Sequence, residues 1–243
     1  MDLLSDETEV FDAGDDGRCG VVFLARRVVC DAAATRRVLE TLESLRSEGW
    51  AVSLDQILAS RAGQVPPSNP FVFETGFTHD RDIAGIFEAP SLEAAHAGVA
   101  RLEQAGWIQV LRTEWLIGPR EFLPVISRNS RNSDDWAFFA LWTWKDAWHS
   151  ASDEQRRAYD LECDTAFDSD LRLGAAISGR HRLDVASRWD HIGVWRVPGP
   201  DMVDEAMRAH AAVADFKYTT SRHYLGRRIS LATALSDAVR ETA

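Results

Sequence analysis

Histidine is unevenly distributed along the 243-residue chain. Four of the seven histidines fall between residues 181 and 223, at His181, His191, His210 and His223. Imidazole changes charge near neutral pH and is a common metal ligand. The cluster therefore predicts acid–base or metal chemistry in the second half of the chain. The alternative is that these histidines are structural and hydrogen-bonded within a core.

His210 lies on the apolar stripe of a predicted helix over Pro200–Ala214. The helical period places Val203, Ala206 and Met207 on the same face as His210. Such a residue is either a core histidine paired with a carbonyl or carboxylate, or a functional one. In the functional interpretation His210 is a metal or haem ligand, or a general base.

A predicted strand over His191–Arg196 carries a second histidine. Alternation places His191 and Trp195 on one face, with Gly193 between them leaving space. This arrangement suits a ligand pocket walled by Trp195. The alternative is a half-solvated His191 at the start of the strand.

The last predicted strand, Phe216–Leu225, is unusually polar from Tyr218 onward, and its alternation sends Arg222 and His223 to opposite faces. Buried hydroxyls and charges need partners. A polar small molecule would supply them, and so would water or a network of ion pairs.

Basic residues gather around a predicted hairpin, at Arg180, Arg182 and Arg188. Together with His181 and His191 they predict a cationic rim that attracts a carboxylate substrate or haem propionates. The alternative is a solvated hairpin with surface ion pairs, which contribute little.

An internal repeat provides the elements that would position these residues. Two stretches align without gaps at an offset of 108 residues, with matched glycines at Gly85 and Gly193 and matched prolines at Pro90 and Pro198. The pattern and turn residues indicate duplication.

The aligned histidines replace apolar residues of the first half. His191, His210 and His223 stand opposite Ile83, Leu102 and Trp115 in the alignment. We therefore expect a polar pocket in the second half and a structural core in the first.

Hydrophobic periodicity predicts β-α-β-β-α-β in each half, with helix boundaries at Ser91, Gly106 and a Ser152–Gln155 capping box. The predicted strands include Trp107–Ile117 in the first half and Leu171–Arg180 in the second. The predicted organisation is an acidic flexible tail (1–19), a first ferredoxin-like repeat (20–123), a linker (124–135), and a second repeat with a C-terminal helix (136–243).

Composition excludes several classes of function. Acidic residues number 38 and basic residues 27, and seven of the acids lie in the first sixteen residues. Nucleic acid is therefore not an expected partner. There is no membrane-length apolar run. The first residues have no basic start and no long apolar run, so we expect no signal peptide. Three cysteines without a C-x-x-C pair indicate free thiols and a cytoplasmic protein.

The doubled element order and the G-x-x-x-x-P turn (Gly85 to Pro90, Gly193 to Pro198) resemble the dimeric α/β-barrel superfamily over residues 20–229. This superfamily includes antibiotic-biosynthesis and haem-degrading monooxygenases, chlorite-dismutase-like haem proteins, aldoxime dehydratases and polyketide cyclases. The resemblance implies an α+β fold in which two fused ferredoxin-like repeats form an intrachain dimeric α/β barrel. Because the tandem fusion supplies its own sheet-to-sheet contact, we expect a monomer or loose homodimer.

The expected function is that of a small-molecule enzyme with oxidative or dehydrative chemistry, in which haem is a candidate cofactor. Its substrate would be anionic or aromatic. His191, His223 and Arg222 are the expected catalytic residues. His210 is the expected haem or metal ligand, with Trp195 and Arg180 completing the cofactor site. The alternatives are a cofactor-free monooxygenase or polyketide-type cyclase, and a non-catalytic ligand-binding module.

Overall fold

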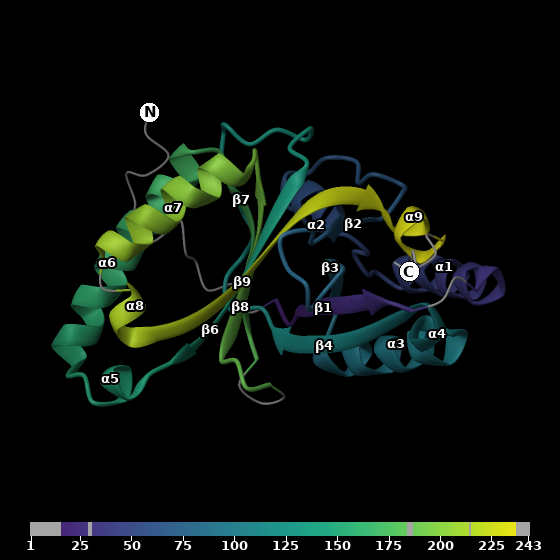
Figure 1. The fold of residues 1–243 in the computed structure, drawn as a ribbon, viewed down its shortest axis with the longest axis horizontal. Helices are drawn as coiled ribbons and strands as arrows, with labels where there is room; N and C mark the ends of the chain where they lie inside the picture. The colour runs from purple at the N-terminus through teal and green to yellow at the C-terminus, as the bar shows by residue number, and fades with distance from the viewer. Residues whose placement is uncertain (1–15, 29–30, 184–186, 214, 237–243) are drawn as a thin grey trace.

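The computed structural model of the chain describes residues 16–28, 31–183, 187–213 and 215–236. The β-α-β-β-α-β order occurs twice, with short additional helices (Figure 1). The first repeat consists of β1 (Cys19–Arg27), α1 (Ala32–Ser47), α2 (Leu54–Arg61), β2 (Phe71–Glu74), β3 (Ile83–Ala89), α3 (Leu92–Ala105), α4 (Trp107–Val110) and β4 (Leu111–Pro119).

The second repeat follows the two-residue strand β5 (Val125–Ile126). It consists of β6 (Trp136–Trp144), α5 (Asp146–His149), α6 (Asp153–Arg172), β7 (Ala176–Arg182), β8 (His191–Val197), α7 (Pro200–Ala212), α8 (Asp215–Tyr218), β9 (Thr219–Ser230) and α9 (Leu231–Ser236). Most of the predicted acidic tail, Cys30, Asp184 and the predicted helix beyond Ser236 lie outside the described residues.

The helix-end signals in the sequence are confirmed. Ser91 caps α3 through its side chain, and Gly106 ends that helix in the left-handed region at φ 112°. The Ser152–Gln155 capping box at the start of α6 has both of its hydrogen bonds. These are local interactions, and the residue types alone specify them.

The sheet has the strand order β4-β1-β3-β2-β9-β6-β8-β7-β5. Each repeat thus contributes four antiparallel strands in the ferredoxin-like order, and the two sets join where β2 pairs with β9. At the far edges an isolated bridge joins Arg120 to His181. The backbones of Gly118 and Arg182 approach so closely there that a Cβ added to Gly118 would lie 1.7 Å from the Arg182 carbonyl oxygen. The sheet therefore closes into a barrel.

The faces of the two sheets that lack helices pack against each other. Val22 and Ile86 from the first repeat belong to one buried cluster with Phe139, Ile192 and Val194 from the second. In Figure 1 α1 and α3 lie on one outer side of this barrel and α6 and α7 on the other. The short helix α2 instead packs Leu54, Ile57 and Leu58 into the cluster shared by the two repeats. The chain is an α+β protein of the expected architecture.

Three predicted boundaries differ from the structure. The strand expected from Trp107 begins at Leu111, because Trp107–Val110 forms the helical turn α4 after the Gly106 cap. The strand expected from Leu171 begins at Ala176, because α6 continues to Arg172. The last strand likewise begins at Thr219, after α8.

The C-terminal helix does not stay with the second repeat. Strand β9 crosses from one half of the molecule to the other (Figure 1), and α9 packs Leu231 and Leu235 into the core beneath the helices of the first repeat. The Thr35 hydroxyl also donates to the Leu235 carbonyl. Helix α9 thereby completes the buried core beneath α1 and α3 of the first repeat.

Candidate active site

A cavity of about 420 Å³ lies between the helices and the sheet of the second repeat. Its walls come from β6, β7, β8 and β9 on the sheet side and from α6 and α7 on the helix side. This volume is within the usual range for a small-molecule site. The corresponding layer of the first repeat holds a continuous buried cluster of 22 residues, against nine in the second.

Corresponding positions explain where the space comes from. Phe23 pairs across the sheet with Gly85 and Trp115, and Ala140 pairs in the same way with Gly193 and His223. At the 108-residue offset Trp107 corresponds to Asp215. Three mutually packed rings, Phe23, Trp107 and Trp115, are therefore replaced by Ala140, Asp215 and His223, and all three replacements line the cavity.

His210 faces the cavity from α7, as the helical stripe predicts, and both of its ring nitrogens have carboxylate partners. Nε2 lies 3.1 Å from Asp170 Oδ2 and Nδ1 lies 3.0 Å from Asp215 Oδ2. Burial lowers the pKa of His210, but these two hydrogen-bonded carboxylates outweigh burial and raise it to about 9. At neutral pH His210 is an imidazolium held between two aspartates.

His223 has the opposite character. It lines the cavity from β9, and its ring lies 4.9 Å from that of Phe138. Burial lowers the pKa of His223, Asp215 acts against that effect, and the charge of His210 adds to it, leaving the pKa below its usual value. The ring is therefore neutral at pH 7 and has a basic nitrogen.

Aromatic rings line one side of the cavity. Trp144 and Trp148 stack with centroids 4.2 Å apart, and Tyr159 meets the Trp148 ring edge-on at 5.4 Å. Trp142 adds a further ring, and the Tyr159 hydroxyl donates to Asp215 Oδ1 at 2.8 Å. These side chains give the cavity an aromatic wall beside Asp215, which also lines it.

Two of the expected site residues meet at Glu121. Arg180 Nε donates to Glu121 Oε2 at 2.5 Å, and His191 Nε2 lies 3.2 Å from the same oxygen. Burial raises the pKa of Glu121, but His191 and Arg180 outweigh it and lower the pKa to about 2. His191 also stacks on Trp142 at 5.3 Å. Arg180 and Glu121 line the cavity, whereas His191 stands behind the wall that Glu121 and Trp142 form.

Two buried polar atoms of the wall lack a hydrogen-bond partner. Trp195 lies over Gly193, is 6% exposed and has an unpartnered indole Nε1. Asp170 is 3% exposed, and its Oδ1 is unpartnered although Oδ2 meets His210. Unsatisfied buried groups in a cavity wall mark places where a ligand can donate or accept.

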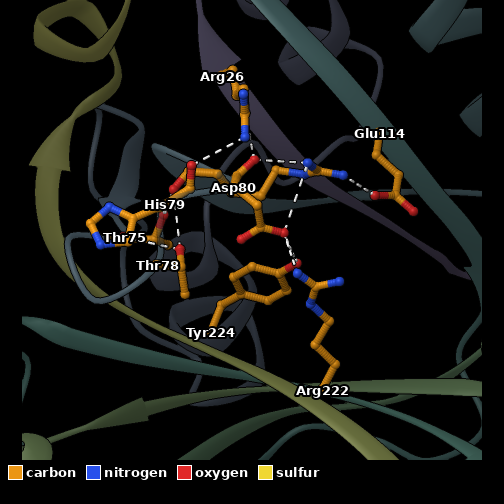
Figure 2. A network of polar contacts seen from close by, with 9 residues as sticks. Arg26, Thr75, Thr78, His79, Asp80, Glu114, Arg222 and Tyr224 are labelled. Atoms are coloured by element: carbon orange, nitrogen blue, oxygen red, sulfur yellow. Dashed lines mark hydrogen bonds and ion pairs between the residues drawn. The ribbon is translucent and has the colours of Figure 1, made fainter.

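Arg222, an expected catalytic residue, does not reach the cavity. Strand alternation points Ser221 and His223 into it and Arg222 away, toward the first repeat. Figure 2 shows Arg222 and Tyr224 meeting Asp80, and Tyr224 Oη lies 3.1 Å from Asp80 Oδ2. Arg222 is therefore part of a contact between the repeats.

The expected cationic rim is also not observed as such. Arg180 is paired with Glu121, and His181 is fully buried against Gly20 between the repeats. Arg188 lies over the Trp189 ring at 5.1 Å. The basic side chains of this hairpin therefore lie in different surroundings and do not form one cationic rim.

The sequence interpretation missed several cavity residues on α6. Tyr159, Cys163 and Asp170 recur at helical spacing along the face that meets the cavity. An acid on the inner stripe of an amphipathic helix was the available signal for Asp170. Burial raises the pKa of Cys163 to about 12, so this cysteine is a thiol.

A haem ligated by His210 does not fit this arrangement. Iron ligation needs a free imidazole lone pair, and both nitrogens of His210 are hydrogen-bonded to carboxylates. Releasing Nε2 would leave the buried Asp170 without this partner, and releasing Nδ1 would break the hydrogen bond to the half-buried Asp215. Arg180, the expected propionate partner, is engaged by Glu121. Among the described residues no group of three or more His, Cys, Asp or Glu side chains is arranged to hold a metal ion.

No protein-family model and no curated protein sequence matches the chain. Solved structures do. A variant of the chlorite dismutase from Candidatus Nitrospira defluvii superposes with a TM-score of 0.68 at 12% identity, covering 94% of this chain and 97% of that one. The same enzyme in complex with imidazole gives 0.62 at 13% identity, over 94% and 97%. None of the described helices is long and apolar enough to cross a membrane. The chain has the ferredoxin-like dimeric α/β-barrel fold of the chlorite dismutases.

Proposed function

We propose that the chain is an enzyme that binds a small organic molecule in the cavity of the second repeat and removes a proton from it with His223. The observation that carries this proposal is a neutral imidazole in the wall of an aromatic-lined cavity. A general base must be unprotonated at working pH and within reach of bound substrate. His223 meets the first condition and borders the space where substrate would lie.

The neighbouring groups support the same role. Proton transfer to His223 creates an imidazolium, which the nearby Asp215 carboxylate favours and the charge of His210 opposes. His210 holds Asp215 through a 3.0 Å hydrogen bond and is a positioning residue. Within the oxidative or dehydrative chemistry that the fold resemblance implies, proton removal is the step that these residues supply.

The haem-dependent form of the proposal is the weaker one. The shared fold is the argument for haem, and the doubly hydrogen-bonded His210 is the argument against it. A haem titration followed by absorption decides between them. We expect that added haem gives no Soret band that depends on His210. A Soret band that appears with the wild type and is lost in His210→Ala would restore haem as the cofactor.

Proton abstraction can be tested before the substrate is known. Small aromatic compounds with an acidic C–H are screened by ligand-observed NMR in D₂O, first for binding and then for hydrogen–deuterium exchange. We expect compounds whose binding is lost in Ala140→Phe, where the added ring occupies the cavity. His223→Gln should retain binding and lose the catalysed exchange.

The outcomes are separable. If a folded Ala140→Phe protein binds every compound as the wild type does, the cavity is not the binding site. If His223→Gln exchanges the proton as fast as wild type, His223 is not the base.

A further inference from the structure

We infer that the ligand of this cavity is an organic cation: a protonated amine on an apolar body that also carries a hydrogen-bond acceptor. This inference rests on the proposed function, because it assumes that the cavity binds a small molecule. It replaces the anionic substrate that the basic residues of the sequence suggested.

Charge is the first argument. Two cationic side chains line the cavity, Arg180 and the His210 imidazolium. Five carboxylates line it with them: Glu121, Asp160, Asp164, Asp170 and Asp215. The wall therefore carries an excess of negative charge, which extends from the exposed Asp160 to the buried Asp170, where unbalanced charge is costly. A bound cation would balance part of it, and a bound anion would add to it.

The excess is concentrated on one helix face. Asp160 and Asp164 are separated by one helical turn on α6 and both border the cavity. Like charges at this spacing destabilise a helix. Burial raises the pKa of Asp160, and Arg180 offsets this effect only in part. A ligand ammonium beside Asp160 would relieve part of the repulsion.

Aromatic rings are the second argument, because ring faces attract cations. Trp144, Trp148 and Tyr159 form a cluster that lines the same cavity as Asp160. Arg156 lies over the Trp148 ring at 5.3 Å and Trp144 stacks on the same ring, so a ligand cation would use the other rings of this cluster, those of Trp144 and Tyr159. Rings and carboxylates together select an ammonium over a neutral or anionic group.

The unsatisfied atoms of the wall complete the chemical description. Asp170 Oδ1 can accept only from a donor, which an ammonium N–H provides. Trp195 Nε1 can only donate, so the ligand also carries an acceptor. Both side chains are more than nine-tenths buried and both border the cavity.

The test compares three probes that share one body and differ in charge: 2-phenylethylammonium, 2-phenylethanol and 3-phenylpropionate. Binding to the full chain is measured by calorimetry or NMR at low salt. We expect the cation to bind roughly tenfold or more tightly than the alcohol, from combined cation–π and carboxylate contacts. The anion should bind more weakly than the alcohol.

Variants locate the effect. Asp160→Asn and Asp164→Asn should each weaken binding of the cation several-fold and leave binding of the alcohol unchanged. Glu205→Gln is the matched control, because Glu205 is exposed on α7, does not line the cavity and loses the same charge. It should change neither. If Ala140→Phe fails to fold, Ala206→Leu blocks the cavity from the helix side.

The results distinguish this inference from the proposed function. If the alcohol or the anion binds as tightly as the cation, and Ala140→Phe abolishes that binding, the cavity binds small molecules and the inference of a cation is wrong. If none of the three probes loses binding in Ala140→Phe or Ala206→Leu, both are wrong.

Discussion

The helix-covered layer of the first repeat is filled, and the same layer of the second repeat is hollow. Trp107 is fully buried in the first, with the rings of Phe23 and Trp115 at 5.3 Å and 5.0 Å. The corresponding residues of the second repeat, Ala140, Asp215 and His223, border a cavity of about 420 Å³. One fold thus serves as a stability core on one side and as a binding site on the other.

The difference shows how a duplicated domain can gain a site without changing its strand order. Removing buried rings costs stability, because dispersion contacts and hydrophobic burial are lost. The first repeat keeps those contacts, and α9 adds Leu231 and Leu235 to them. The intact core of one half can then support a polar cavity in the other.

The largest expected effect is in the filled layer. Trp107→Ala should lower the free energy of unfolding by about 3–5 kcal/mol, the usual cost of deleting a fully buried aromatic ring. Trp148→Ala in the hollow layer should cost clearly less, because Trp148 is only half-buried and faces the cavity. Urea unfolding of both variants measures the difference. Equal losses would contradict the comparison.

A matched pair of helix residues gives the next effect. His210→Leu should cost about 3 kcal/mol or more, because it leaves the buried Asp170 without its cation and removes one partner of the half-buried Asp215. The additional changes Asp170→Asn and Asp215→Asn should restore part of the loss. The counterpart Leu102→His should also destabilise, since the first repeat has no carboxylates at those positions. Failure of the asparagine changes to recover stability would show that the charges are not the cause.

The pH dependence of stability has a definite sign. The folded pKa of His210, about 9, lies above the unfolded value of 6.5. Its stabilising contribution is therefore complete below about pH 6.5 and is lost as the pH rises through 9. The loss should be on the order of 2–3 kcal/mol in wild type and absent in His210→Gln. Melting curves from pH 6 to 10 measure it, and parallel curves for the two proteins would argue against an imidazolium.

Refilling the cavity should have a small effect on stability and a large one on binding. Ala140→Phe restores the residue found at the corresponding position, Phe23, and should change the free energy of unfolding by no more than about 1 kcal/mol, because the ring enters existing space. Calorimetry with 2-phenylethylammonium should show binding abolished. A variant that keeps wild-type affinity would place the ligand elsewhere.

The smallest effect on stability and binding is expected for Arg222, which the sequence predicted to be catalytic. Arg222→Ala removes a half-exposed ion pair with Asp80 and should cost about 0–1 kcal/mol. Ligand binding and proton exchange should be unchanged, because Arg222 points away from the cavity. A loss of exchange comparable to that in His223→Gln would show that Arg222 does serve the site.

Local signals in the sequence predicted the helix caps and the alternation that separates His223 from Arg222. The repeat alignment predicted which half would be polar, because its histidines replace Ile83, Leu102 and Trp115. The partners of those histidines could not be predicted in the same way. Asp170 meets His210 across two packed helices, and Asp80 meets Arg222 from another repeat. The short helix Trp107–Val110 was missed because its residues favour strands and the preceding Gly106 turn determines its conformation.

Calorimetric titration of wild type and Ala140→Phe with 2-phenylethylammonium tests the central claim most directly. The claim is that the second repeat binds a ligand where the first repeat packs three rings. We predict saturable one-to-one binding to wild type and none to the folded variant. Identical binding to both proteins would contradict it, and binding to neither would contradict the inference that the ligand is a cation.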